Sequence, residues 1–167
     1  DAYRAYAYFR WVDDVVDADS GSRFERGAFL ERQKSLLESC YMGKPLQDAS
    51  RNENMLVELV LADHEQNSGL QTYLRNMMLV MDFDARRRGR LISQVELNEY
   101  TRWLASAVTE AMHYFIGHGN FSPHDETRYL AVSAAHITHM LRDTLDDLQA
   151  GYRRGRGAVV GGGINSQ

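Results

Sequence analysis

The stretch YFRWVDDVVD, residues 8 to 17, places three aspartates in a segment that otherwise has the character of a buried helix. Tyr8, Val12 and Val15 are spaced by four and three, so they share one helical face and predict a ridge against a core. A neighbouring line on the same helix carries aromatic and ionisable side chains, namely Tyr3, Tyr6, Arg10, Asp13 and Asp17. The role of the aspartates therefore depends on what faces this line.

A second segment, near residues 124 to 150, has the same layout. Apolar side chains at steps of four and three predict a core-facing ridge: Leu130, Ala134, Ile137, Leu141, Leu145 and Leu148. About one residue of rotation away runs a line of ionisable groups, His136, His139, Asp143 and Asp147. Two predicted helices far apart in the sequence thus each carry a line of ionisable groups beside an apolar ridge.

The composition is that of an ordinary globular chain with one domain. It has 167 residues, 44% of them hydrophobic, and a formal net charge of only -4, which does not favour a nucleic-acid partner. Cys40 is the single cysteine, which excludes an intrachain disulfide and predicts a reducing, cytoplasmic setting. No apolar run reaches the roughly 18 residues of a membrane helix, although contact with a membrane surface stays open.

The two prolines, Pro45 and Pro123, both lie between segments with helical periodicity. The sequence therefore predicts an all-α fold, with helices at about residues 2–18, 23–41, 51–66, 69–87, 94–117 and 124–150. Apolar stripes on two of these helices predict core packing rather than a cofactor site: Leu70, Tyr73, Leu74, Met77, Met78 and Met81, then Leu97, Tyr100, Leu104, Ala107, Val108, Ala111 and Phe115.

The spacing of the aspartates suggests a chemistry. Helical residues four apart project side by side, so Asp13 with Asp17, and Asp143 with Asp147, each present two neighbouring carboxylates. Like charges at this spacing favour a compensating cation, and Mg²⁺ is commonly held by one or two carboxylates plus substrate phosphates. Two such pairs across a cavity could hold a metal-bound diphosphate.

These segments resemble a known family. YAYFRWVDDVVD and THMLRDTLDD are similar to the two aspartate-rich motifs of the squalene and phytoene synthases, which join prenyl diphosphates head to head. ELNEYTRWLASAV, between them, is similar to the family segment that carries an aromatic residue, here Tyr100. The motifs occur in the family's order.

The resemblance implies an isoprenoid-synthase helical bundle around a central cavity, with prenyl diphosphates as substrates and Mg²⁺ as cofactor. It implies metal binding by Asp13, Asp17, Asp143 and Asp147, with Asp14 assisting. It further implies cation stabilisation by Tyr6 and Tyr100, and substrate contacts from Arg10, Arg142, His136 and His139. The run Arg86, Arg87, Arg88 and Arg90 is interpreted mainly as the basic end of a helix before Gly89.

The chain also departs from the family pattern. His136 and His139 stand where members typically have Gln and Asn, and Thr109 stands where glycine is common, so it would narrow the approach to the cavity. Both ends predict a fragment of a longer protein, with a helical domain at residues 1–152 and a Gly-rich tail at 153–167. AVVGGGINS resembles the start of a dinucleotide fold but lacks its helix and acidic partner, so NADPH is not supported.

Two other functions stay open at this point. One is a non-catalytic domain of the same family that binds a prenyl lipid or a partner helix. The other is a transition-metal site in a helical bundle, built from His136, His139 and Asp143. A di-iron site is disfavoured, since the sequence has one clear Glu-x-x-His pair, Glu110 with His113. Neither the oligomeric state nor the substrate length follows from the sequence.

Overall fold

The computed structural model describes residues 1–18, 22–44, 48–87, 92–117 and 125–142, and over these residues the chain is helical without strands. The helices are α1 (Ala2–Asp17), α2 (Arg23–Tyr41), α3 (Glu53–Leu61), α4 (Gly69–Arg87) and α5 (Gln94–Ile116), followed by the 3₁₀ turn η1 (Glu126–Tyr129). Residues 130–142 continue as α-helix. In this part of the chain the predicted all-α class is confirmed.

Two of the helices begin at capping boxes that the local sequence specifies. Ser22 accepts a hydrogen bond from the backbone N–H of Glu25, and the Glu25 carboxylate accepts one from the backbone of Ser22. Ser93 and Glu96 do the same at the start of α5. These reciprocal bonds satisfy N–H groups that the first helical turn leaves without partners.

Helix α3 is shorter than the predicted 51–66 because the chain turns at Asp63. The Asp63 carboxylate accepts hydrogen bonds from the Tyr41 hydroxyl at 3.1 Å and the Ser68 hydroxyl at 2.5 Å. Asn67 then adopts a positive φ of 55°. Such side-chain bonds offer the backbone an alternative to helical continuation.

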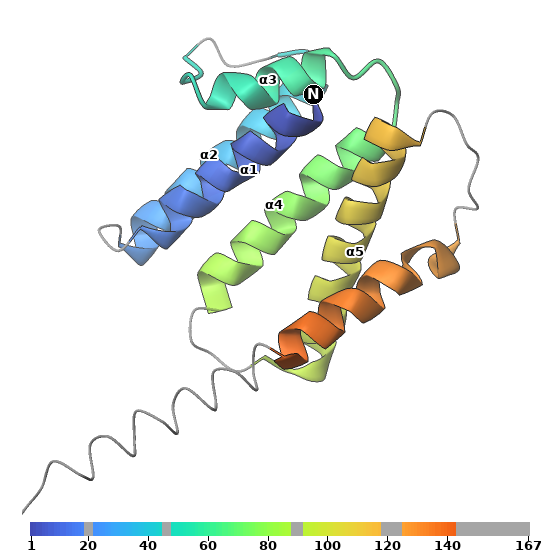
Figure 1. The fold of residues 1–167 in the computed structure, drawn as a ribbon. Coiled ribbons are helices and arrows are strands. Elements are labelled where there is room, and N and C mark those ends of the chain that lie inside the picture. Colours follow the sequence, from blue (N-terminus) through green and yellow to red (C-terminus); the bar gives the residue numbers. More distant parts are fainter. Residues whose placement is uncertain (19–21, 45–47, 88–91, 118–124, 143–167) are drawn as a thin grey trace, which may run out of the picture.

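The hydrophobic core lies among α1, α2, α3 and α4. Helix α4 packs along α5 and also contacts α1 and α2 (Figure 1). The predicted stripe on α4 is confirmed as core, with Leu70, Leu74 and Met78 fully buried. On α1, Tyr8 and Val12 are fully buried as predicted, whereas Val16 rather than Val15 completes the buried face.

The predicted ridge on the last helix is wrong over the described residues. Leu130 is 62% exposed, Ile137 43% and Leu141 62%, and Ala134 is exposed as well. The half-buried residues of this helix, His136 among them, lie on the adjacent face. Periodicity identified an apolar stripe correctly, but Leu130 and Ile137 line an open hollow of about 700 Å³ with residues of α4 and α5, so the stripe borders this hollow and is not packed as core.

No helix in the described ranges has the length and apolarity needed to cross a membrane.

Candidate active site

The first aspartate line lies on the solvent-facing side of α1. The Arg10 guanidinium forms ion pairs along its own helix, with Asp14 at 2.9 Å and with Asp13 at 3.5 Å. The side chains of Arg10, Asp13 and Asp14 are 59%, 43% and 58% exposed. Exposed pairs of this kind contribute little to stability, so Arg10 can exchange them for a phosphate oxygen at small cost.

Asp13 is surrounded by more acidic than basic side chains. Partial burial raises the pKa of its carboxyl, and the charges of Asp17, Asp14 and Asp84 raise it further, while Arg10 opposes them. The ion pair with Arg10 therefore does not balance the acidic groups around it. A divalent cation would relieve this repulsion, and the paired carboxylates of Asp13 and Asp17 match the ligands that Mg²⁺ commonly uses.

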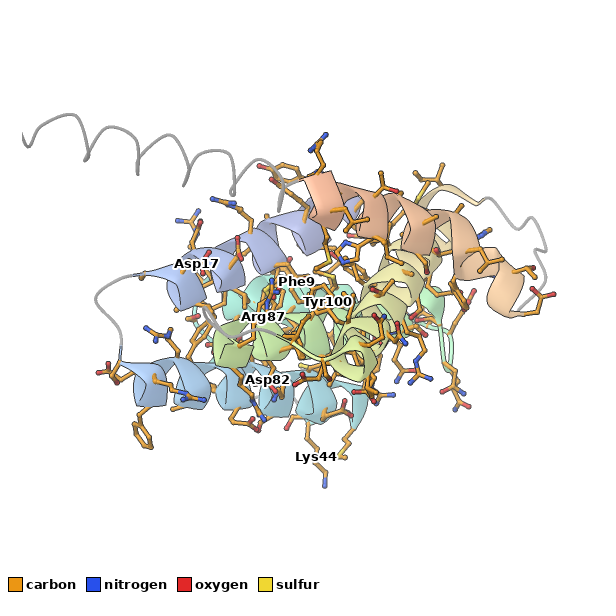
Figure 2. The ribbon with its side chains drawn as sticks, turned by 90° about the horizontal axis from the view of Figure 1, so that it is seen from below. Phe9, Asp17, Lys44, Asp82, Arg87 and Tyr100 are labelled. Atoms are coloured by element: carbon orange, nitrogen blue, oxygen red, sulfur yellow. The ribbon has the colours of Figure 1, made fainter. Side chains whose placement is uncertain are left out.

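Asp84, near the end of α4, connects this acidic line to the rest of the site. Its carboxylate accepts a hydrogen bond from the Tyr100 hydroxyl at 3.0 Å and another from Arg87 Nε at 2.8 Å. The Arg87 guanidinium also lies over the Tyr100 ring, 5.7 Å from its centroid. Figure 2 labels Arg87 and Tyr100 near the middle of the view and Asp17 on α1. The Arg87 side chain is still 35% exposed.

The sequence did not single out Asp84, whereas Arg86 and Arg87 do lie in the last turn of α4, as the helix-end interpretation predicted. The arginine run was interpreted as a helix end, and Arg86 fits that interpretation because it pairs with Asp82 of the preceding turn at 2.8 Å. Asp82 lies on the side of α4 toward α2, where it also binds Lys34 at 3.0 Å (Figure 2). The sequence could have indicated two separate ion pairs here, because two aspartates are followed by two arginines: Asp82, Asp84, Arg86 and Arg87. One pair stabilises the helix, whereas the other lies at the candidate site.

The rings of Tyr100 and His136, two of the predicted site residues, lie next to each other. Tyr100 is only 8% exposed, and its ring centroid lies 5.4 Å from that of His136. Burial raises the pKa of the Tyr100 phenol, and the Asp84 charge adds to that effect. Helix α5 and the helix at residues 130–142 therefore contact each other at the candidate site.

The other predicted site residues that the structure describes are exposed to solvent, except for Thr109. Tyr6 is 64% exposed on α1. His139 and Arg142 are exposed, and Arg142 Nη2 lies 3.1 Å from His139 Nε2. Thr109 is buried and lines a hollow of about 280 Å³ with Met112, Ile116 and Val132, among others.

Asp143 and Asp147 lie outside the described residues, as do Arg88, Arg90 and the tail at 153–167. The second aspartate pair therefore stays a prediction. The structure describes a helix up to residue 142, and its His136 lies close enough to Asp84 to be affected by its charge.

The transition-metal site of His136, His139 and Asp143 stays a prediction, because Asp143 lies outside the described residues. Over those residues, no group of three or more His, Cys, Asp or Glu side chains is arranged to hold a metal ion. Glu110 of the Glu-x-x-His pair instead accepts hydrogen bonds from the Tyr129 hydroxyl at 2.8 Å and from Arg128 at 3.0 Å. It anchors η1 to α5.

One of three comparisons with known proteins finds a match. A family model described as squalene/phytoene synthase matches residues 1–157, a range that includes both aspartate motifs and the Tyr100 segment. Searches of the curated proteins and of the solved structures find no match. Since the family model spans most of the sequence, the chain belongs to the squalene/phytoene synthase family.

Proposed function

We propose that this chain carries the active site of a transferase that joins two prenyl diphosphates head to head and releases pyrophosphate, as in squalene or phytoene synthesis. The supporting observation is the cluster around Asp84. It brings α1, α4, α5 and the helix at residues 130–142 together at the residues that the family motifs single out.

Asp13 and Asp17, together with Asp143 and Asp147, would hold magnesium, and Asp14 would assist. When bound, the metal stabilises the negative charge of the departing diphosphate. Arg10 and Arg142 would contact phosphate oxygens, and His136 and His139 would line the mouth of the cavity. Tyr6 and Tyr100 would stabilise the prenyl cation through their ring faces.

The hydrocarbon chain would lie against α5. Leu104, Val108 and Met112 follow Tyr100 at intervals of four residues, so they continue its face along the helix. Three such intervals extend about 18 Å at the rise of an α-helix. The stripe reaches the hollow that Met112 and Val132 line, which places an apolar surface next to the acidic end of the site.

The direct test incubates the full chain with farnesyl diphosphate, with and without Mg²⁺, and measures pyrophosphate and the condensed prenyl product. We expect product only with Mg²⁺, and a loss of roughly 10²-fold or more in the double variant Asp13→Asn/Asp17→Asn. The matched control, Glu31→Gln/Glu99→Gln, removes two charges from exposed positions elsewhere and should retain activity.

Equal activity in the aspartate variant and the control would contradict the proposed function. Binding of farnesyl diphosphate in the presence of Mg²⁺, without release of pyrophosphate, would favour the alternative of a non-catalytic prenyl-lipid-binding domain.

A further inference from the structure

His136 has a polar atom that the described structure leaves without a partner. Its Nε2 is buried from water and has no hydrogen-bond partner among the described residues. A buried unpaired nitrogen costs on the order of 1–3 kcal/mol, and such atoms call for a specific explanation. His136 therefore has an unused hydrogen-bonding site next to the Tyr100 ring.

The groups around His136 favour a neutral imidazole with a carboxylate nearby. Burial lowers the pKa of His136, and the charges of His139 and Arg87 lower it further, while Asp84 acts in the opposite direction. Asp84 is itself held by the Tyr100 hydroxyl and by Arg87. The imidazole is thus neutral near pH 7, and a positive charge formed on it would lie close to a fixed carboxylate.

His136 also lies where the polar and apolar parts of the site meet. Its ring contacts Tyr100, at the start of the Leu104, Val108 and Met112 stripe. Val132, one helical turn before His136, lines the hollow beside Met112. A prenyl chain on this stripe, with its diphosphate toward Asp13, would have its first carbons near His136.

We propose that His136 is the catalytic base of this site, and that Asp84 is the residue that positions it. The inference rests on the proposed function and adds to it the residue that receives the proton ending the reaction.

The proton transfer balances without a further reactant. A C–H bond next to the cationic carbon breaks, and its electron pair becomes the π bond of a neutral alkene. The proton forms an N–H bond at Nε2, which gives an imidazolium beside Asp84. After the product leaves, the imidazolium releases the proton to water. A glutamine at this position could donate or accept a hydrogen bond, but it could not take up the proton.

The test compares the full-length wild-type chain with His136→Gln, Asp84→Asn and the control His64→Gln, an exposed histidine of the α3–α4 loop. Each is incubated with farnesyl diphosphate and Mg²⁺, and pyrophosphate, hydrocarbon and prenyl alcohol are measured separately. We expect His136→Gln to reduce hydrocarbon formation roughly 10²-fold, to reduce pyrophosphate release much less, and to divert product to alcohols as water captures the cation.

The pH profile separates a base from a structural residue. Wild-type hydrocarbon formation should decline only below the ordinary pKa of histidine, as the imidazole becomes protonated, and this limb should be absent in His136→Gln. Asp84→Asn removes the charge that raises the pKa of His136, so the pKa measured by NMR should fall further. The acid limb should therefore be absent in His136→Gln, shifted to lower pH in Asp84→Asn, and unchanged in His64→Gln.

Different negative results would contradict the base assignment, the positioning role of Asp84 and the proposed function. If the wild type releases pyrophosphate and His136→Gln gives the same ratio of hydrocarbon to alcohol, the base assignment is wrong while the proposed function stands. A pKa of His136 that Asp84→Asn leaves unchanged would overturn the positioning role. If the wild type releases no pyrophosphate, the proposed function fails, and the base assignment fails with it.

Discussion

Two clusters of this protein combine a tyrosine, a carboxylate and an arginine, yet they differ in completeness. In the core cluster, the Tyr8 hydroxyl donates to Gln33, the Gln33 amide donates to Glu53, and Arg32 binds both oxygens of Glu53. In the site cluster, Tyr100 and Arg87 both donate to Asp84.

The difference lies in what is left unpaired. Glu53 is 3% exposed and accepts further hydrogen bonds from Ser50, so the core cluster satisfies its buried carboxylate. The site cluster leaves His136 Nε2 without a partner and Asp13 among other acids. Similar residue types thus stabilise the fold in one region, whereas in the other they leave unpaired groups that a ligand could satisfy.

Of the two clusters, the core cluster should have the larger effect on stability. Glu53→Gln should lower the free energy of unfolding by about 2 kcal/mol, because Arg32 loses its charged partner and the buried Gln33 amide loses a strong acceptor. Urea-induced unfolding measures the change. Asp48→Asn is the matched control: it weakens an exposed pair to the same arginine and should cost less than about 0.5 kcal/mol. Equal losses of unfolding free energy in the two variants would show that burial of the acidic partner makes no difference.

Acid should unfold the protein partly through the same residue. Chiefly the Arg32 hydrogen bonds hold the pKa of Glu53 at about 2, below its ordinary value of 4.5. A lowered carboxyl pKa contributes stability that is complete above about pH 4.5 and is lost as the pH falls toward 2. Thermal unfolding between pH 6 and pH 3 should therefore show a decline that is shallower in Glu53→Gln. An identical decline in both proteins would contradict this prediction.

The site cluster should respond to metal instead. Mg²⁺ at about ten times its dissociation constant should raise the free energy of unfolding by about 1.4 kcal/mol. Without metal, Asp13→Asn should stabilise the chain by a few tenths of a kcal/mol, because it relieves like-charge repulsion. Thermal shift with and without Mg²⁺ measures both effects. An Mg²⁺ response that persists in Asp13→Asn/Asp17→Asn would place the metal elsewhere.

The smallest effect is expected at Ile137 of the last described helix, which borders an open hollow and not the packed core. Ile137→Ala should change stability by less than about 0.5 kcal/mol, since this side chain is 43% exposed. Leu74→Ala, at a fully buried position of α4, should cost about 3 kcal/mol. A large loss from Ile137→Ala would show that this face is packed in solution.

Most of the helices could be predicted from the sequence because their signals are local. Periodic apolar residues, capping serines and the positions of proline all act within a few residues. The end of α3 could not be predicted in this way, because Asp63 binds Tyr41 from another helix. The same limit applied to the stripe at Leu130, Ile137 and Leu141: its period was evident, but the face that packs depends on how this helix crosses α5.

The sequence by itself determined the all-helical class, the aspartate line on α1 and the motifs that the family shares, since each is a pattern of spacing along one helix. Only the tertiary structure decided that Asp84 and Arg87 belong to the site with Tyr100 and His136. The physical reason is that these contacts join α4, α5 and the helix at residues 130–142. Their geometry depends on helix packing, which no spacing within one segment encodes.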